Sequence, residues 1–302
     1  MYRHLLLLLT ILPFFTFGQD TSWQSFKLVN GQIHVPVTVN DVDGFAVIDT
    51  GATTTGISNR LIEQHSEKYT FSKSVTISGV MGKRKVRPVH NINISTLNKS
   101  IIYRRILPIP THGKEKHNVI ALIGMDFLSH FVVSIDYPNS RIKLSQRSSF
   151  VFDKPSNVKV FQRKHFAMVD IELILENNIP LKMLLDTGNN GGALVRRSTL
   201  ENKNLLRGRE FTLKKRAGIY RKVELESYIF NHVVLGPHKI NNVVLQTVQK
   251  GQKSNYDRSY SHSKLKYRKD GVQGIIGYEI LKDFVLTIDT KRKYLRLDKI
   301  ET

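Results

Sequence analysis

The sequence predicts an all-β protein built from two duplicated lobes. Three features support this fold class: an internal repeat, short segments in which apolar and polar residues alternate, and a scarcity of helical patterns. The chain has 302 residues, of which 40% are hydrophobic, so it is long enough for two lobes that each bury a core. We therefore expect a first lobe over residues 19–150 and a second over residues 151–302, with a linker near Ser148–Pro155.

The repeat is clearest in two Asp-Thr-Gly triplets and in the segments that follow them. Asp49-Thr50-Gly51 and Asp186-Thr187-Gly188 each come directly after an apolar run. Further along, residues 121–144 align without gaps on residues 274–297, and eight of 24 positions are identical. The offset is 137 residues at the triplets and 153 at these segments, so the second copy holds about 16 additional residues. A period of this length indicates two similar domains, because solenoid repeats are far shorter.

Each lobe is expected to begin with two strands that lead into its triplet. The alternating apolar residues of the first strand are Ile33, Val35, Val37 and Val39 in one lobe and Val169, Ile171, Leu173 and Leu175 in the other. After a turn, the chain returns as Phe45–Ile48 and as Leu181–Leu185. Short helices are expected at Ser58–Gln64, Met125–Ser129 and Glu279–Lys282.

The first 18 residues have the pattern of a cleavable signal peptide. A short basic start precedes the apolar run Leu5–Phe17, and Thr16-Phe17-Gly18 provides a cleavage site before Gln19. The run is short for a membrane span, although an anchor that is not cleaved is the alternative interpretation. We therefore expect a periplasmic or extracellular protein without stable membrane insertion. The chain contains no Cys, so it must be stable without disulfides.

The net charge of +21 raises the question of nucleic acid binding. The basic residues are scattered and no nucleic-acid motif is present, so no nucleic acid partner is expected. The densest basic stretch, Lys250–Lys269, contains interleaved Tyr residues and coincides with the additional length of the second repeat. We interpret it as a solvated surface loop. The alternative is a patch that attracts acidic peptides or anionic surface polymers.

Most other hydrolytic chemistries find no support in the sequence. The chain has no Cys, no His-Glu-x-x-His and no Gly-x-Ser-x-Gly, which argues against thiol, zinc-peptidase and serine-hydrolase mechanisms. The eleven His residues show no spacing typical of metal ligands. We therefore expect neither a metal nor a cofactor.

Two copies of an apolar pair followed by Asp-Thr-Gly, each with a later apolar-apolar-Gly segment, resemble the pepsin and retropepsin group of aspartic proteases. More narrowly, the chain resembles secreted bacterial aspartyl proteases with two retropepsin-like halves, over about residues 25–298. The resemblance implies two β-barrel-like lobes with a central cleft, and catalysis by Asp49 and Asp186 at its base. It also implies that Thr50 and Thr187 interlock the lobes, and that Gly51 and Gly188 complete the turns. Because one chain carries both acids, a monomer that acts on peptides or proteins is expected.

The resemblance also implies a hairpin that covers the cleft. The segment Gly79-Val80-Met81-Gly82 resembles the tip of this flap. The pair of carboxyl groups would share a proton, because two nearby carboxylates cannot easily both ionise. The ionised member would accept a proton from water, and the protonated member would polarise the carbonyl of the bond that is cut.

Several positions depart from the family pattern. Ala52 and Asn189 follow the two triplets, where a hydroxyl residue often donates a hydrogen bond to the carboxylate. Ala121 stands where the family usually has Gly, and no match to the flap Tyr of pepsin-like enzymes is evident. The alternatives left open are that each Asp only caps its own turn, or that a catalytically weak or inactive protein binds peptides or surface polymers on the same fold.

Overall fold

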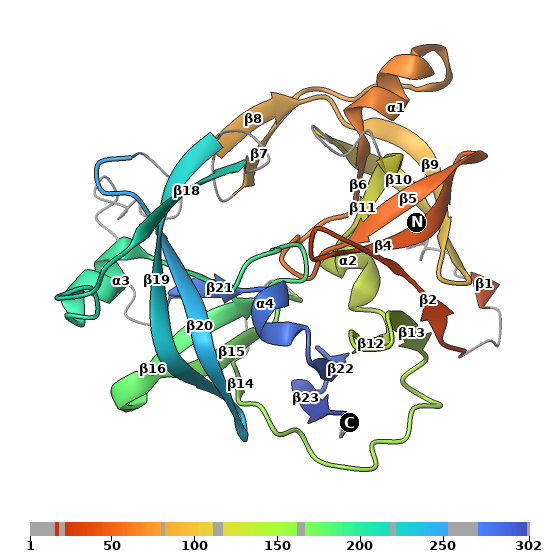
Figure 1. The fold of residues 1–302 in the computed structure, drawn as a ribbon. Helices are drawn as coiled ribbons and strands as arrows, with labels where there is room; N and C mark the ends of the chain where they lie inside the picture. Colours follow the sequence, from red (N-terminus) through yellow and green to blue (C-terminus); the bar gives the residue numbers. More distant parts are fainter. Residues whose placement is uncertain are drawn as a thin grey trace, which may run out of the picture.

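The structure is a computed structural model, and it describes residues 16–17, 22–79, 82–110, 117–161, 167–217, 222–252 and 271–300. Two closed six-stranded β-barrels, one from each half of the chain, stand on a sheet to which both halves contribute (Figure 1). The predicted all-β fold with two duplicated barrels is confirmed, and it is consistent with a bilobed aspartic protease.

The first barrel closes through six strands in the order β4-β5-β11-β6-β10-β9, with β9 pairing again with β4. These strands are β4 (Gln32–Val39), β5 (Val42–Ile48), β6 (Gly56–Ser58), β9 (Val89–Thr96), β10 (Lys99–Ile109) and β11 (Val119–Ile123). Two short strands, β1 (Thr16–Phe17) and β3 (Lys27–Val29), pair with β10 and β4. A separate hairpin, β7 (Val75–Gly79) and β8 (Gly82–Val86), precedes β9.

The second barrel repeats this topology in the order β15-β16-β21-β17-β20-β19, with β19 pairing again with β15. Its strands are β15 (Asp170–Leu175), β16 (Ile179–Leu185), β17 (Ala193–Val195), β19 (Lys222–Leu235), β20 (His238–Val248) and β21 (Gly274–Ile276). Two further strands, β14 (Val160–Phe161) and β18 (Thr212–Ala217), pair with β15 and β19.

The alternation seen in the sequence fixes which faces of β4 and β15 point into the barrels. All eight of the predicted core positions are at most 3% exposed: 33, 35, 37 and 39 on β4, 171, 173 and 175 on β15, and 169 directly before β15. Because successive strand residues face opposite sides, this pattern determines the register of each strand. The returning strands β5 and β16 then pair antiparallel with them, as predicted.

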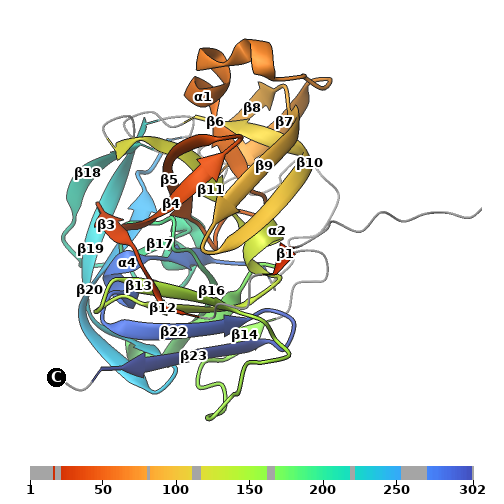
Figure 2. The same ribbon diagram turned by 90° about the vertical axis from the view of Figure 1, so that its right-hand side faces the viewer.

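A shared sheet connects the two halves beneath the barrels. It has the order β2-β13-β12-β22-β23 and comprises β2 (Gln24–Ser25), β12 (Val132–Asp136), β13 (Arg141–Ser145), β22 (Phe284–Asp289) and β23 (Tyr294–Lys299). Strands β12 and β22 come from different halves and form an antiparallel ladder from Val133↔Ile288 to Asp136↔Val285. Figure 2 shows this sheet at the opposite side of the molecule from β7 and β8.

A buried ion pair also crosses between the halves. The Arg147 Nε donates to Asp289 Oδ1 at 2.8 Å, and Asp289 is fully buried. The same guanidinium donates to the main-chain carbonyls of His130 and Phe131, close to the end of a short helix. Removing one partner of such a buried pair leaves an uncompensated charge, at a cost of about 3–5 kcal/mol.

Helix is limited to short segments in the part of the chain that the structure describes. These are α1 (Asn59–Gln64), α2 (Met125–Leu128), α3 (Arg197–Asn202) and α4 (Tyr278–Leu281), with single 3₁₀ turns at Ser66–Lys68 and Glu176–Asn178. Three were predicted, and α3 was not. None of the described helices has the length and hydropathy needed to cross a membrane.

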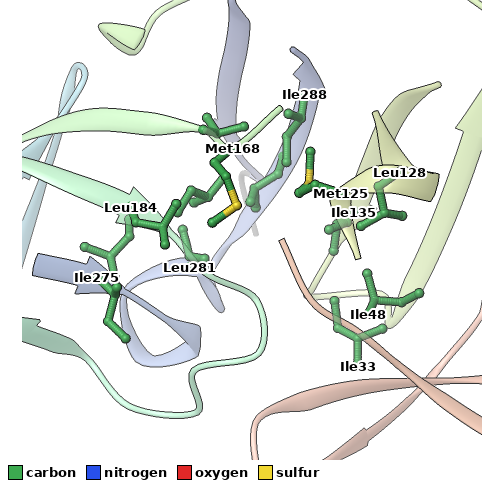
Figure 3. Close-up of a cluster of buried hydrophobic side chains, with 14 of the residues drawn as sticks. Ile33, Ile48, Met125, Leu128, Ile135, Met168, Leu184, Ile275, Leu281 and Ile288 are labelled. Carbon is green, nitrogen blue, oxygen red and sulfur yellow. The ribbon is translucent and has the colours of Figure 1, made fainter. Parts of the chain in front are cut away.

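The apolar core is continuous between the halves. Figure 3 shows Ile48, Met125 and Ile135 of the first half on one side of this cluster, and Leu184 and Ile288 of the second half on the other. All five are at most 8% exposed. The two lobes are therefore held together by apolar packing as well as by the shared sheet.

Candidate active site

The two Asp-Thr-Gly triplets form matching turns at the ends of β5 and β16. The main-chain N–H of Asp49 donates to the carbonyl of Ile123 on β11, and that of Asp186 donates to Ile276 on β21, both at 3.0 Å. Each aspartate then accepts, at 2.9 Å, the N–H of the glycine two residues later. The pattern that repeats in the sequence therefore produces the same local geometry twice.

The threonines of the two triplets join the lobes through four hydrogen bonds. The Thr50 hydroxyl donates to the Leu185 carbonyl at 2.8 Å and accepts the Thr187 N–H at 3.1 Å. In the reciprocal arrangement, the Thr187 hydroxyl donates to the Ile48 carbonyl at 2.8 Å and accepts the Thr50 N–H at 3.1 Å. Both threonines are at most 1% exposed. This reciprocal set fixes the position of each turn relative to the other.

The interlock brings the two carboxyl groups together. A Cβ atom added at Gly51 would lie 2.3 Å from Cγ of Asp186, and one added at Gly188 would lie 2.6 Å from Cγ of Asp49. Each carboxyl group therefore packs against the glycine of the opposite triplet, where no larger residue fits. Both aspartates are partly exposed, so water can reach them.

The environment of Asp186 favours its protonated form. Its pKa is raised well above the ordinary value of 3.8. The first cause is desolvation of the carboxyl group by the surrounding protein, and the next are the charge of Asp49 and a hydrogen bond with Asp49. The N–H groups of Gly188 and Asn189 oppose this shift, because they donate to Oδ1 at 2.9 and 3.2 Å. The pair therefore holds one proton over a range of pH in which an isolated aspartate is ionised.

The duplicated Gly residues of the later segments support these turns from behind. The N–H of Met125 donates to Ala52, and that of Tyr278 donates to Asn189, both at 2.9 Å. A Cβ at Gly124 would lie 2.7 Å from the carbonyl carbon of Thr54, and one at Gly277 would lie 2.2 Å from the Asn189 carbonyl oxygen. Close main-chain approach explains why both copies of the segment carry Gly.

Comparison with known proteins agrees with this geometry. Residues 35–130 match the family model described as "gag-polyprotein putative aspartyl protease". This part of the chain is similar to retropepsin-like aspartyl proteases. The match covers Asp49 and most of the first barrel, and it ends before the second triplet. A comparison with curated proteins gives no match. The family match supports a general aspartic protease function.

The residues that follow the triplets contribute no side-chain hydroxyl. Ala52 has none, and the Asn189 amide is engaged within its own loop. Its Oδ1 accepts the Gly191 N–H at 3.2 Å, and its Nδ2 lies 3.5 Å from the Gly192 carbonyl oxygen. Asn189 thus shapes the turn and supports Asp186 through its main chain alone.

Sequence reasoning missed several neighbours of the triplets. The Gln32 side chain, at the start of β4, donates across the lobes to the Gly188 carbonyl at 2.5 Å. Tyr278 contacts the first lobe at Gly31, and its ring lies 5.8 Å from that of Tyr137. Burial, followed by the nearby Asp186 charge, raises the pKa of Tyr137. No identity between the repeats marks these positions, because Tyr137 and Tyr278 align with Thr290 and Met125, and Gln32 lies outside the aligned segments.

The predicted flap lies on the β7–β8 hairpin. Gly79 ends β7 and pairs with Gly82, which begins β8. Val80 and Met81, the other predicted tip residues, lie outside the described residues. Most of the basic stretch Lys250–Lys269 also lies outside them. The family's flap function for this hairpin therefore stays a prediction.

The threonine interlock gives the first testable prediction. Thr187→Val keeps the shape of the side chain but leaves the Ile48 carbonyl and the Thr50 N–H without their partner. Because each of these two buried groups costs about 1–3 kcal/mol when it is left unsatisfied, we expect a loss of about 2–6 kcal/mol in the free energy of unfolding. Denaturant titration measures it, and Thr187→Ser, which keeps the hydroxyl, is the matched control. Equal stability of the Val variant and the wild type would contradict the role of these bonds.

Proposed function

We propose that this protein is an exported aspartic endopeptidase that hydrolyses peptide bonds with water activated between Asp49 and Asp186. The observation that carries the proposal is the packing of each carboxyl group against the glycine of the opposite triplet. The raised pKa of Asp186 and the family match support it. Because both acids belong to one chain, the active unit we propose is a monomer.

The mechanism follows from a pair of carboxyl groups that shares one proton. The ionised member removes a proton from water as the water oxygen attacks the carbonyl carbon of the peptide bond. The protonated member donates a hydrogen bond to the carbonyl oxygen, where negative charge develops. The proton taken from water then passes to the leaving nitrogen as the carbon–nitrogen bond breaks, and the pair returns to its starting state.

A diverse peptide library incubated with the purified protein at several pH values tests the proposal. Cleavage that disappears in Asp49→Asn and in Asp186→Asn establishes the enzyme. Binding of peptides without cleavage would instead favour a binding protein on the same fold. The basic start and apolar run at the N-terminus support export. Sequencing the N-terminus of secreted or periplasmic material tests this part, with Gln19 as the expected first residue.

The pH dependence of cleavage is a further prediction. Since burial and Asp49 raise the Asp186 pKa, the shared proton is kept as the pH rises above the ordinary range of an aspartate. We therefore expect a bell-shaped profile with its optimum between mildly acidic and near-neutral pH. A strongly acidic optimum would contradict this assignment.

Ala52→Ser tests the contribution of the missing hydroxyl. A serine here is expected to donate to the ionised Asp49 carboxylate, which favours ionisation and shifts the acidic limb of the profile to lower pH. Ala52→Gly is the matched control, because it changes the same side chain without adding a donor. An equal shift in both variants would show that the effect is steric.

A further inference from the structure

The second half contains a hairpin that corresponds to the β7–β8 hairpin of the first. Strand β18 pairs with the beginning of β19, from Thr212↔Ser227 to Ala217↔Lys222, and β19 then continues into the barrel. In the first half, β7 pairs with β8, and the chain enters the barrel as β9 after Arg87-Pro88. Thus β18 corresponds to β7, and β19 corresponds to β8 and β9 together.

Both hairpins lie on the side of the molecule away from the shared sheet. Figure 1 shows β8 and β18 on one side and β22 and β23 on the other, and Figure 2 shows the same arrangement after a quarter turn. One hairpin belongs to each lobe, and the aspartate pair lies where the lobes interlock. The two hairpins therefore stand on opposite sides of the junction that holds the pair.

These hairpins belong to strongly basic parts of the sequence. Residues 68–114, which include β7 and β8, contain ten Lys or Arg residues and no Asp or Glu. Residues 211–223, which include β18 and the start of β19, contain five Lys or Arg residues and no Asp or Glu. Lys85 on β8 and Lys214 and Lys215 on β18 have exposed side chains, as does Lys73, two residues before β7.

The acidic residues near the second hairpin neutralise little of this charge. Glu224 lies 3.8 Å from Lys215, but both side chains are substantially exposed, so the pair is weak. Glu226 is buried and accepts hydrogen bonds from Tyr228 and Arg197. Two further acids, Asp136 and Asp289, lie away from the hairpins: they are buried in the shared sheet, and each is paired with its own arginine. Positive charge therefore dominates the two hairpins.

We propose that the two hairpins select acidic peptides, with Asp or Glu on both sides of the bond that is cut. This inference rests on the proposed protease function and adds the substrate class to it. Long-range attraction to the hairpins raises the rate at which anionic segments reach the site. Because basic residues lie on both lobes, acidic residues on either side of the scissile bond each meet a positive surface.

The test uses a peptide that the library shows to be cut, made in two forms that differ only by Glu or Gln at two positions on each side of the scissile bond. At about 0.02 M salt we expect kcat/KM to be about tenfold higher for the Glu form, and at about 0.5 M salt less than about threefold higher, because salt screens exposed charges. Equal kcat/KM values for the two forms at low salt would overturn the proposal.

Double substitutions of lysines test whether the hairpins cause the preference for the Glu form of the peptide. Lys73→Gln with Lys85→Gln, and Lys214→Gln with Lys215→Gln, are each expected to reduce the preference for the Glu form about threefold. The control, Lys239→Gln with Lys291→Gln, removes the same charge from exposed positions next to the shared sheet and is expected to leave the preference unchanged. An equal reduction in the control would show that only net charge matters.

Failure of the proposed function is distinguishable from failure of this inference. If no peptide is cut, one library peptide is labelled and made with Glu or with Gln at four positions. Fluorescence anisotropy of these two forms with the same variants then measures the selectivity through binding, and equal affinities overturn the inference. Polyphosphate, added as a competitor of the labelled peptides, distinguishes selection of peptides from general binding of polyanions. Hairpin-dependent binding of polyphosphate without any preference between the two peptides would overturn the proposal in favour of an anionic polymer.

Discussion

Asp49→Asn and Asp186→Asn are each expected to abolish peptide cleavage while leaving the fold intact. An Asn side chain keeps the shape of Asp, and its oxygen still accepts the N–H of the following glycine, as Asp49 and Asp186 do at 2.9 Å. It cannot accept a proton from water, and it breaks the proton sharing between the two acids. Since general acid–base catalysis contributes roughly 10²–10⁴-fold, we expect kcat to fall by at least about 10²-fold in either variant.

The stability of Asp186→Asn separates loss of chemistry from loss of folding. A raised pKa means that the folded protein prefers the protonated acid, so this contribution is complete below the unfolded value of 3.8 and is lost as the pH rises through the folded pKa. Asn behaves like the protonated acid at every pH. The variant should therefore have a higher Tm than the wild type at neutral pH and a similar Tm in strong acid.

Asp283→Asn is the control for these two variants, because Asp283 is exposed and lies outside the triplets. It should leave both kcat and Tm close to the wild-type values. Full activity in either triplet variant would exclude the two-carboxylate mechanism. A lower Tm of Asp186→Asn at neutral pH would instead show that the charge of Asp186 stabilises the fold.

The parts of the fold that the sequence predicts are those determined by local patterns. Alternation at Ile33–Val39 identifies both the strand and its buried face, because the period of two allows only one register with a dry core. Ser58 precedes the helix α1 and marks its start in the sequence, because its hydroxyl caps the helix by accepting the Arg60 N–H. Its counterpart α3 begins after Arg196, which provides no side-chain cap, and so it was not predicted.

The parts that escaped prediction depend on contacts between distant segments. The aligned segments 121–144 and 274–297 contain β12 and β22, yet nothing local indicates that these strands pair with one another across the halves. Gln32 bonds to Gly188, which is 156 residues away. The second hairpin was missed because its basic strands lack the Gly-x-x-Gly pattern that marked the first. Such features become visible only once the topology is known.

Dividing the chain should remove activity from each half, and mixing the halves should restore it. The division is best placed between Ser149 and Phe150, because Ser149 bonds back to Gln146 while Phe150 contacts Phe152, which packs on Tyr294 of the second half. Each fragment, 19–149 or 150–302, then carries one triplet and cannot form the mixed pair of carboxyl groups. The activity of mixtures, titrated with one fragment in excess, measures reassembly.

The ion pair between the halves makes this experiment quantitative. In fragment 19–149, Arg147→Ala leaves the buried Asp289 of the other fragment without its 2.8 Å partner. A cost of about 3 kcal/mol or more corresponds to at least about 100-fold weaker reassembly. Arg292→Ala is the control, because Arg292 is 51% exposed, lies 3.5 Å from the same carboxylate and belongs to the same fragment as Asp289. Its effect should stay below about fivefold, as for other exposed ion pairs.

One outcome would overturn the intramolecular site. If a single fragment is active by itself, two identical triplets must form the catalytic pair, as in a self-paired dimer. The threonine interlock is symmetric, but another bond across the halves is not: Gln32 of the first half donates to Gly188 of the second. Fragment 150–302 has Met168, not a glutamine, directly before its matching alternating run, and its β22 would lose the ladder that β12 provides. Activity should therefore require one copy of each half.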